Sequence, residues 1–248
     1  MAHADALALA RTGRLQAARS TSQRAVELAM QDNEREAAAG YRAARAVWEA
    51  LCGNSAEAAK TAGSALELSK GRDVTYASGL ALALSGELPR AEALVRDLAK
   101  RFPEDTFTKF TYVPALRGRL ALQRGKAESS IEELEMARSY ELAVNGLNFP
   151  HLVLGGLHSA HVRGEALTAA RRYGEAAAEF QRILEQPGIV GSDPISALAH
   201  RQLGRLYALA GDRMRAKISY ERFLVLWKDA DADIPVLKRA KEELGRLQ

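Results

Sequence analysis

The sequence has little cysteine, no long apolar run and little net charge. Its 248 residues include one cysteine, Cys52, which excludes an internal disulfide and a metal site built from several cysteines. Trp48, Ala50 and Leu51 stand close to Cys52, so we expect a small buried residue here rather than a nucleophile.

No apolar run approaches the roughly 18 residues that a membrane-spanning helix needs. The N-terminal residues also lack the basic front region and the apolar core of a secretory signal. We therefore expect a soluble chain, cytoplasmic unless a longer parent protein holds it across a membrane.

Lysine and arginine total 35 against 31 aspartates and glutamates, and the net charge of +4 is dispersed along the chain. A dedicated nucleic-acid-binding protein usually concentrates its basic residues. Nucleic-acid binding by a helical-repeat protein is therefore an alternative and not the leading hypothesis.

Catalytic signatures are missing as well. The sequence has no P-loop, no nucleophile elbow around a serine and no kinase glycine loop, His-Arg-Asp or Asp-Phe-Gly sequence. We expect neither an enzyme nor a cofactor, and a cryptic metal-dependent enzyme is the lesser alternative.

What the sequence does have is an internal repeat. A short phrase recurs in which a small residue and a glycine precede a polar residue and, a few positions later, an alanine. A glycine at such a turn ends one helix, because it takes a positive φ without penalty. The turn position falls on Gly13, Gly53, Gly86, Gly125 and Gly211, and on Arg171 in the fifth copy.

The last copy, "HRQLGRLYALAGDRMRAKISYERFL", resembles the tetratricopeptide repeat (TPR). The family pattern of Trp-x2-Leu-Gly-x2-Tyr followed by Ala-x3-Phe falls on His200, Leu203, Gly204, Tyr207, Ala216 and Tyr220, with histidine in place of the tryptophan. A mid-helix glycine costs about 1 kcal/mol relative to alanine. We expect a close approach of the partner helix to explain Gly204.

This resemblance implies an all-α fold, a TPR-type α-solenoid that forms a right-handed superhelix of about six helix-turn-helix repeats. It covers residues 1–248 as one domain, with repeats at about 1–32, 39–71, 72–104, 111–144, 157–190 and 197–228 and a capping helix at 233–247. The largest insertion, around 145–156, holds Leu147, Phe149 and Leu152. We favour their packing onto the helices, and a partner-contacting loop is the alternative.

A second resemblance is carried by "FLVLWKDADADIPVLKRAKEEL", "LAKRFPEDT" and "DPISALAH". These stretches look like the C-terminal repeat region of bacterial eukaryotic-like serine/threonine kinases and related multidomain regulators. The resemblance implies that the chain is an interaction or sensing arm of a larger signalling protein.

The stretch "WKDADADIP" alternates aspartates as a calcium loop does. Such a loop also needs a glycine after the third aspartate and a glutamate at the twelfth position, where this chain has Ile234 and Ala240. We instead expect Trp227 to end the last repeat's packing face and Asp233 to be the N-cap of the closing helix.

For the site, the TPR resemblance implies a concave groove lined by the first helix of each repeat, where a protein or peptide segment binds. Arg201 and Arg205 would form a basic strip with Arg119 and take a carboxylate or an acidic segment. His158, His161 and Glu165 share one helical face, which could also hold zinc, but solvated groove residues are the favoured reading. The groove residues expected on this basis are Tyr76, Tyr112, Arg119, His158, His161, Glu165, Arg201 and Arg205.

Overall fold

The computed structural model describes residues 1–143 and 157–247. Leu147, Phe149 and Leu152 of the expected insertion lie outside the described residues, as does His151.

Within the described ranges every regular element is a helix, and most helices form pairs. The pairs are α1 (Ala2–Arg11) with α2 (Leu15–Gln31), α3 (Arg35–Cys52) with α4 (Ser55–Leu68), α5 (Arg72–Leu84) with α6 (Leu88–Arg101), α7 (Val113–Gln123) with α8 (Ala127–Glu135), α9 (His158–Ala169) with α10 (Tyr173–Glu185), and α12 (Ile195–Leu209) with α13 (Arg213–Leu226). A π-helical turn, η1 (Thr108–Tyr112), leads into α7, and α11 (Pro187–Val190) and α14 (Pro235–Gly245) stand outside the pairs. The predicted all-α solenoid of helix pairs is confirmed.

The turns between paired helices follow the predicted pattern. The turn glycines have φ between +75° and +94°, in the left-handed region that favours glycine. In the fifth pair, Arg171 takes the same conformation at φ +60°. The turn geometry is thus kept even where the glycine is not.

Close contact within a pair explains the mid-helix glycines. A Cβ on Gly204 would lie 2.9 Å from the ring of Tyr220 on the partner helix, and one on Gly164 would lie 2.7 Å from Phe180. Neither space admits an alanine without movement, so the expected reason for Gly204 is confirmed. Cys52 is fully buried, as predicted.

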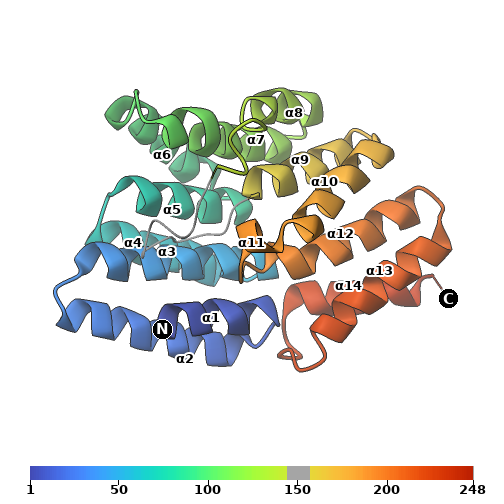
Figure 1. The fold of residues 1–248 in the computed structure, drawn as a ribbon, viewed down its shortest axis with the longest axis horizontal. Coiled ribbons are helices and arrows are strands. Elements are labelled where there is room, and N and C mark those ends of the chain that lie inside the picture. The colour runs from blue at the N-terminus through green and yellow to red at the C-terminus, as the bar shows by residue number, and fades with distance from the viewer. Residues whose placement is uncertain (144–156, 248) are drawn as a thin grey trace.

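The two ends of the array meet. In Figure 1 the first pair, in blue, lies beside α13 and α14, in red. The indole Nε1 of Trp227 donates to the carbonyl of Arg11 at 2.9 Å, and the backbone N–H of Asp231 donates to the carbonyl of Gly13 at 3.0 Å. Apolar residues at both ends, including Leu15, Trp227 and Ile234, belong to one buried cluster. The solenoid is therefore closed on itself, and we call this junction the closure contact.

One aspartate of "WKDADADIP" caps a helix far away in the sequence. The backbone N–H of Gln16, in the first turn of α2, donates to Oδ2 of Asp231 at 2.7 Å. A carboxylate in this position satisfies an orphan N–H and interacts favourably with the helix dipole. The predicted N-cap role of Asp233 is wrong, because α14 begins after Ile234, which makes no side-chain cap, and Asp233 is exposed.

The terminal helix α14 covers the last pair, as the sequence predicted. Leu237 and Ala240 face inward, and α14 packs on α13. It also contacts α3 in the second pair. Pro235 and Arg239 of α14 reach the turn at Gly53, where an added Cβ would lie within 3.0 Å of either side chain. The terminal helix therefore bridges the two ends of the array.

Helix α9 is fixed by a buried charge cluster. Arg163 is fully buried and donates to Oε1 of Glu141 at 2.8 Å, to Oε2 of Glu179 at 2.7 Å and to the carbonyl of Leu134 at 3.1 Å. These contacts hold α8 and α10 to α9. Each charge has a partner, which is the condition under which a buried ion is tolerated.

The closure contact predicts an unequal cost for two similar substitutions. Gly13 and Gly125 share φ +75°, but an added Cβ at Gly13 would lie 2.6 Å from Ala230, whereas nothing lies within 4 Å at Gly125. We expect Gly125→Ala to cost about 1 kcal/mol of unfolding free energy for the left-handed backbone. Gly13→Ala should cost about 1–3 kcal/mol more because it overpacks the junction. Urea unfolding of both variants checks this, and equal costs would show that the ends are not in contact.

The buried cluster predicts a second contrast. Arg163→Leu removes the fully buried cation and leaves Glu141 paired only with Arg182 and Glu179 mainly with Arg138, so we expect a loss of about 2–3 kcal/mol of unfolding free energy. Arg172 pairs with Glu175 on the surface of the same helix pair, and Arg172→Leu should unfold at nearly the wild-type urea concentration. A wild-type midpoint for Arg163→Leu would contradict the role given to the cluster.

Candidate functional site: a central cavity lined by arginines

The inner helices enclose a cavity of about 370 Å3. Its walls come from α3, α5, α7, α9 and α12, which are the first helices of their pairs, from the first residue of α4, and from α14. The polar side chains in the wall are Ser55, Arg119, His161, Glu165, Arg201, Gln202, Arg205, Arg239 and Glu243. Because α14 supplies one wall, the cavity depends on the closure of the array.

Helical spacing explains how these side chains reach one place. On α9, His161 and Glu165 are four residues apart, as are Arg201 and Arg205 on α12, so each pair lies on one helical face. Arg239 and Glu243 repeat this spacing on α14. Helices α9, α12 and α14 each contribute such a pair to the cavity wall, α7 contributes Arg119 alone, and α3 and α5 contribute apolar side chains.

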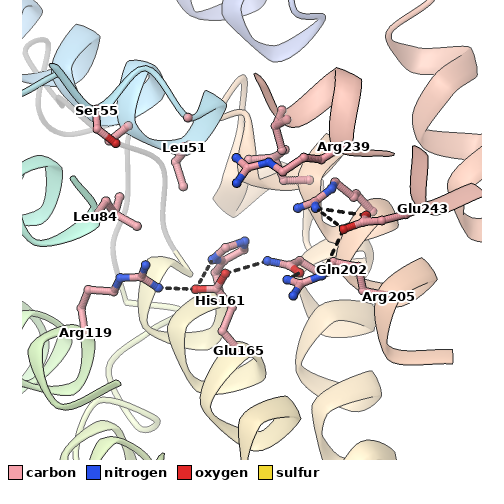
Figure 2. A pocket seen from close by; sticks show the side chains of 15 residues that line it. Leu51, Ser55, Leu84, Arg119, His161, Glu165, Gln202, Arg205, Arg239 and Glu243 are labelled. Atoms are coloured by element: carbon pink, nitrogen blue, oxygen red, sulfur yellow. Dashed lines mark hydrogen bonds and ion pairs between the residues drawn. The ribbon is translucent and has the colours of Figure 1, made fainter. Parts of the chain in front are cut away.

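Glu165 stands at the centre of one half of the cavity (Figure 2). Its Oε2 accepts from Nη1 of Arg119 at 2.5 Å, and its Oε1 accepts from Nε2 of Gln202 at 2.7 Å. Nδ1 of His161 lies 3.9 Å from Oε2 of the same carboxylate. Glu165 thus ties α7, α9 and α12 together across the cavity wall.

Glu243 is the corresponding hydrogen-bond acceptor in the other half of the cavity. Nη2 of Arg201 donates to both of its carboxylate oxygens, at 2.7 and 3.0 Å. Nε of Arg205 lies 3.7 Å from Oε1 of Glu243, while Nη1 of Arg205 donates to Oε1 of Gln202 at 3.0 Å. Gln202 and Arg205 therefore link the two halves.

The cavity carries an excess of positive charge. Four arginines, at positions 119, 201, 205 and 239, face two glutamates, at 165 and 243. Burial opposes ionisation of Glu165, but the charges of Arg119 and Arg205 and the hydrogen bond from Gln202 hold its pKa below the usual value. Burial lowers the pKa of His161, so this ring is neutral at neutral pH. The formal charge of these side chains is then +2.

Several donors in the wall are unused. Nε of Arg119 and Nε of Arg201 are buried without a hydrogen-bond partner in the structure. Arg239 forms no ion pair with any residue in the described ranges. Buried donors without partners cost free energy, so an anion with oxygen acceptors would be favoured in this space.

Five of the eight residues expected from the sequence meet in this cavity: Arg119, His161, Glu165, Arg201 and Arg205. Arg201 and Arg205 were expected as a free basic strip; instead Arg201 is largely buried and paired with Glu243.

The other three expected groove residues lie outside the wall of this cavity. The rings of Tyr76 and Tyr112 stack on each other with centroids 3.9 Å apart, and both side chains are buried. Nε2 of His158 lies 2.8 Å from Oδ2 of the buried Asp193. Each of these three side chains was predicted to face a ligand in the groove. Each contacts a neighbouring side chain of the protein instead.

Sequence reasoning missed Gln202, Arg239 and Glu243. Gln202 stands between two expected residues, and the Arg239–Glu243 pair has the same four-residue spacing as the others. That spacing on the terminal helix was the available signal.

The structure gives no support to a metal or thiol site. Within residues 1–143 and 157–247, no cluster of three histidine, cysteine or acidic side chains is arranged to hold a metal ion. Complete burial raises the pKa of the Cys52 thiol, which keeps it protonated. The same ranges contain no helix with the length and hydropathy of a membrane span.

Comparison with known proteins adds little. No family model matches the sequence, and no curated protein matches it. Among solved structures, a similar one is the crystal structure of the P58(IPK) TPR domain, at 14% sequence identity and a TM-score of 0.36, covering 100% of this chain and 79% of that one. A TM-score this low supports no inference, so the fold and the site stand on the helix packing described above.

The cavity predicts a pH dependence that belongs to one histidine. The folded state lowers the pKa of His161 below its ordinary 6.5, so the unfolded chain binds more protons at acidic pH. Stability is therefore retained above pH 6.5 and falls below it, by at most about 1.4 kcal/mol per pH unit. In His161→Gln this contribution should vanish. Burial also lowers the pKa of His200, so His200 contributes to the pH dependence of both proteins. The test is therefore the difference between the urea midpoints of the wild type and the variant, measured from pH 7.5 to 5.5, in which the contribution of His200 cancels. A constant difference across that range would refute it.

Proposed function

We propose that this chain is a non-enzymatic interaction scaffold that binds an acidic segment of a partner protein, with a carboxylate of that segment held in the central cavity. The observation that carries this is the convergence of four arginines on one cavity, whose wall includes two carboxylates among the described residues.

The chemistry of the wall favours a carboxylate. Guanidinium groups form short, charge-assisted hydrogen bonds with carboxylates, about twice as strong as neutral ones. Arg205 and Arg239 are more exposed than Arg201, so they can turn toward a ligand without leaving a buried acid unpaired. The unused Nε of Arg119 offers a further donor.

The size of the cavity limits what enters. A volume of about 370 Å3 lies near the lower end of the range for small-ligand sites. It accommodates an acidic side chain or a chain end rather than a long extended peptide. The remainder of the partner segment would then run over the rim.

The titratable groups of the cavity are poorly suited to acid–base catalysis. Glu165 is held ionised by Arg119 and has a lowered pKa, which makes it a weak base. Glu243 accepts two hydrogen bonds from Arg201. Both carboxylates have a structural role that would oppose their taking up a proton.

The resemblance of the C-terminal stretch to the repeat regions of bacterial eukaryotic-like kinases extends the proposal. In that setting the scaffold would be an arm of a larger signalling protein, and capture of the acidic segment would bring the partner to it. The proposed binding by the cavity does not depend on this context.

Two conservative substitutions test the cavity. We expect Arg205→Gln and Arg239→Gln each to weaken binding of a fluorescein-labelled, glutamate-rich hexapeptide by about tenfold or more, the equivalent of about 1.4 kcal/mol. Fluorescence anisotropy at several salt concentrations measures this, and the affinity should fall as salt rises. Arg96→Gln is the control, because Arg96 is 72% exposed on α6, outside the cavity wall.

The same peptide with glutamine in place of glutamate separates charge from shape. Equal affinity for the two peptides, or equal affinity of the Arg239→Gln and Arg96→Gln variants, would rule out the cavity as the acidic-segment site.

A further inference from the structure

Helix α13 is apolar on two opposite sides. Its inner side buries Ala216, Tyr220 and Phe223 against the array. Its outer side leaves Met214 75% and Val225 69% exposed. A helix that only packs against its partner helix needs the buried apolar residues on its inner side, but it does not need exposed apolar residues on its outer side.

Three of the exposed apolar residues of α13 form one stripe, and the fourth, Leu226, lies outside it. Met214, Ile218 and Val225 are separated by four and seven residues, so at 3.6 residues per turn they lie within about 40° of one another around the helix. Ile218, 43% exposed, stands between the other two. We call these three residues the α13 stripe.

Basic side chains border the stripe on both sides. The helical angle places Lys217 about 60° from Met214 on one side and Arg222 about 40° from Ile218 on the other, with Arg213 about 100° from Met214, further round the helix. All three are exposed. Arg213 and Arg222 form no ion pair with any described residue, while Lys217 lies 3.9 Å from the carboxylate of Glu221, which stands between Lys217 and Met214. The stripe therefore has an unpaired cation on one side, at Arg222, and the Lys217–Glu221 pair on the other.

This pattern sets α13 apart from the other outer helices. In the described part of the chain, α4, α6 and α10 expose no large apolar side chain, and α2 exposes Leu28 and Met30 at 38% each. The α13 stripe is therefore not a general property of the second helix in a pair.

We propose that the α13 stripe docks an amphipathic helix of a partner protein whose own apolar stripe is bordered by aspartates or glutamates. Apolar residues at steps of four and seven are the spacing at which two helices contact. Acids on the docked helix would meet Arg222 on one edge and Lys217 on the other. Such charge complementarity fixes the orientation and suppresses wrong partners.

A protein helix fits better than an anionic membrane. Three side chains, one of them less than half exposed, give little apolar area to insert among lipids. Glu221 is 52% exposed and lies between Lys217 and the apolar line, where it would face the anionic headgroups. A helix partner can place a neutral or basic residue opposite Glu221, which a lipid surface cannot.

This surface is separate from the central cavity. No residue of α13 lines the cavity wall. Loss of one kind of binding therefore leaves the other intact, and the two proposals can fail independently.

The test uses synthetic 18-residue helical peptides with a leucine stripe, labelled with fluorescein and titrated with the full chain. One peptide has glutamates along both edges of the stripe, one has lysines there, and one has the glutamate sequence scrambled. We expect the glutamate-edged peptide to bind at least tenfold more tightly than the other two. Vesicles of anionic phospholipid form a fourth arm, in which we expect no co-sedimentation.

Met214→Glu should weaken binding of the glutamate-edged peptide at least tenfold, because it places a carboxylate in the stripe among the peptide's own acids. Met136→Glu is the matched control, since Met136 is also an exposed methionine, at 52%, but lies beside Glu135 after α8. Equal loss in the two variants, equal binding of glutamate- and lysine-edged peptides, or binding to the vesicles alone would each overturn the proposal.

Discussion

The closure contact is the interaction on which the rest of the structure depends. Trp227 and Asp231 use the backbone groups at the first turn, between α1 and α2, to satisfy their own hydrogen bonds. In an open array each helix pair contacts only its neighbours. Here the last pair has two neighbours, and one of them is the beginning of the chain. The position of α14, and with it one wall of the cavity, follows from this contact.

Closure also explains the electrostatics of the cavity. In an open groove, arginines on the inner helices would be solvated and their charges screened. Enclosure by α14 removes much of that water and makes pairing necessary, which Glu165 and Glu243 provide in part. The cationic excess is tolerable because Arg205 and Arg239 remain near the rim. The closure of the array therefore accounts both for the pairing of each glutamate with an arginine and for the positive charge that remains in the cavity.

The sequence allowed the helix pairs, their turns and much of the site to be predicted, for local reasons. A turn glycine and the Gly204–Tyr220 contact depend on residues close together in the chain. The closure contact could not be predicted, because Gly13 looks like any other turn glycine and Asp231 caps a helix 215 positions away. The sequence predicted that Asp233 caps the closing helix, but the aspartate that caps a helix is Asp231, and the helix is α2. Tyr76 and His158 were predicted to line the groove but lie outside the cavity wall. Helical periodicity predicts which face of a helix a residue lies on, but it does not predict which side chains pack against that face.

A closed array has a consequence for how such a chain can change over time. Open solenoids grow and shrink by whole repeats, since an added unit finds the same surface at the end as the one before it. A ring has no end to extend. Duplicating or deleting one helix pair would change the angle at which Trp227 returns to Arg11 and would break the junction. The number of pairs in this fold is therefore fixed by geometry, and variation is confined to side chains and to the loops between pairs.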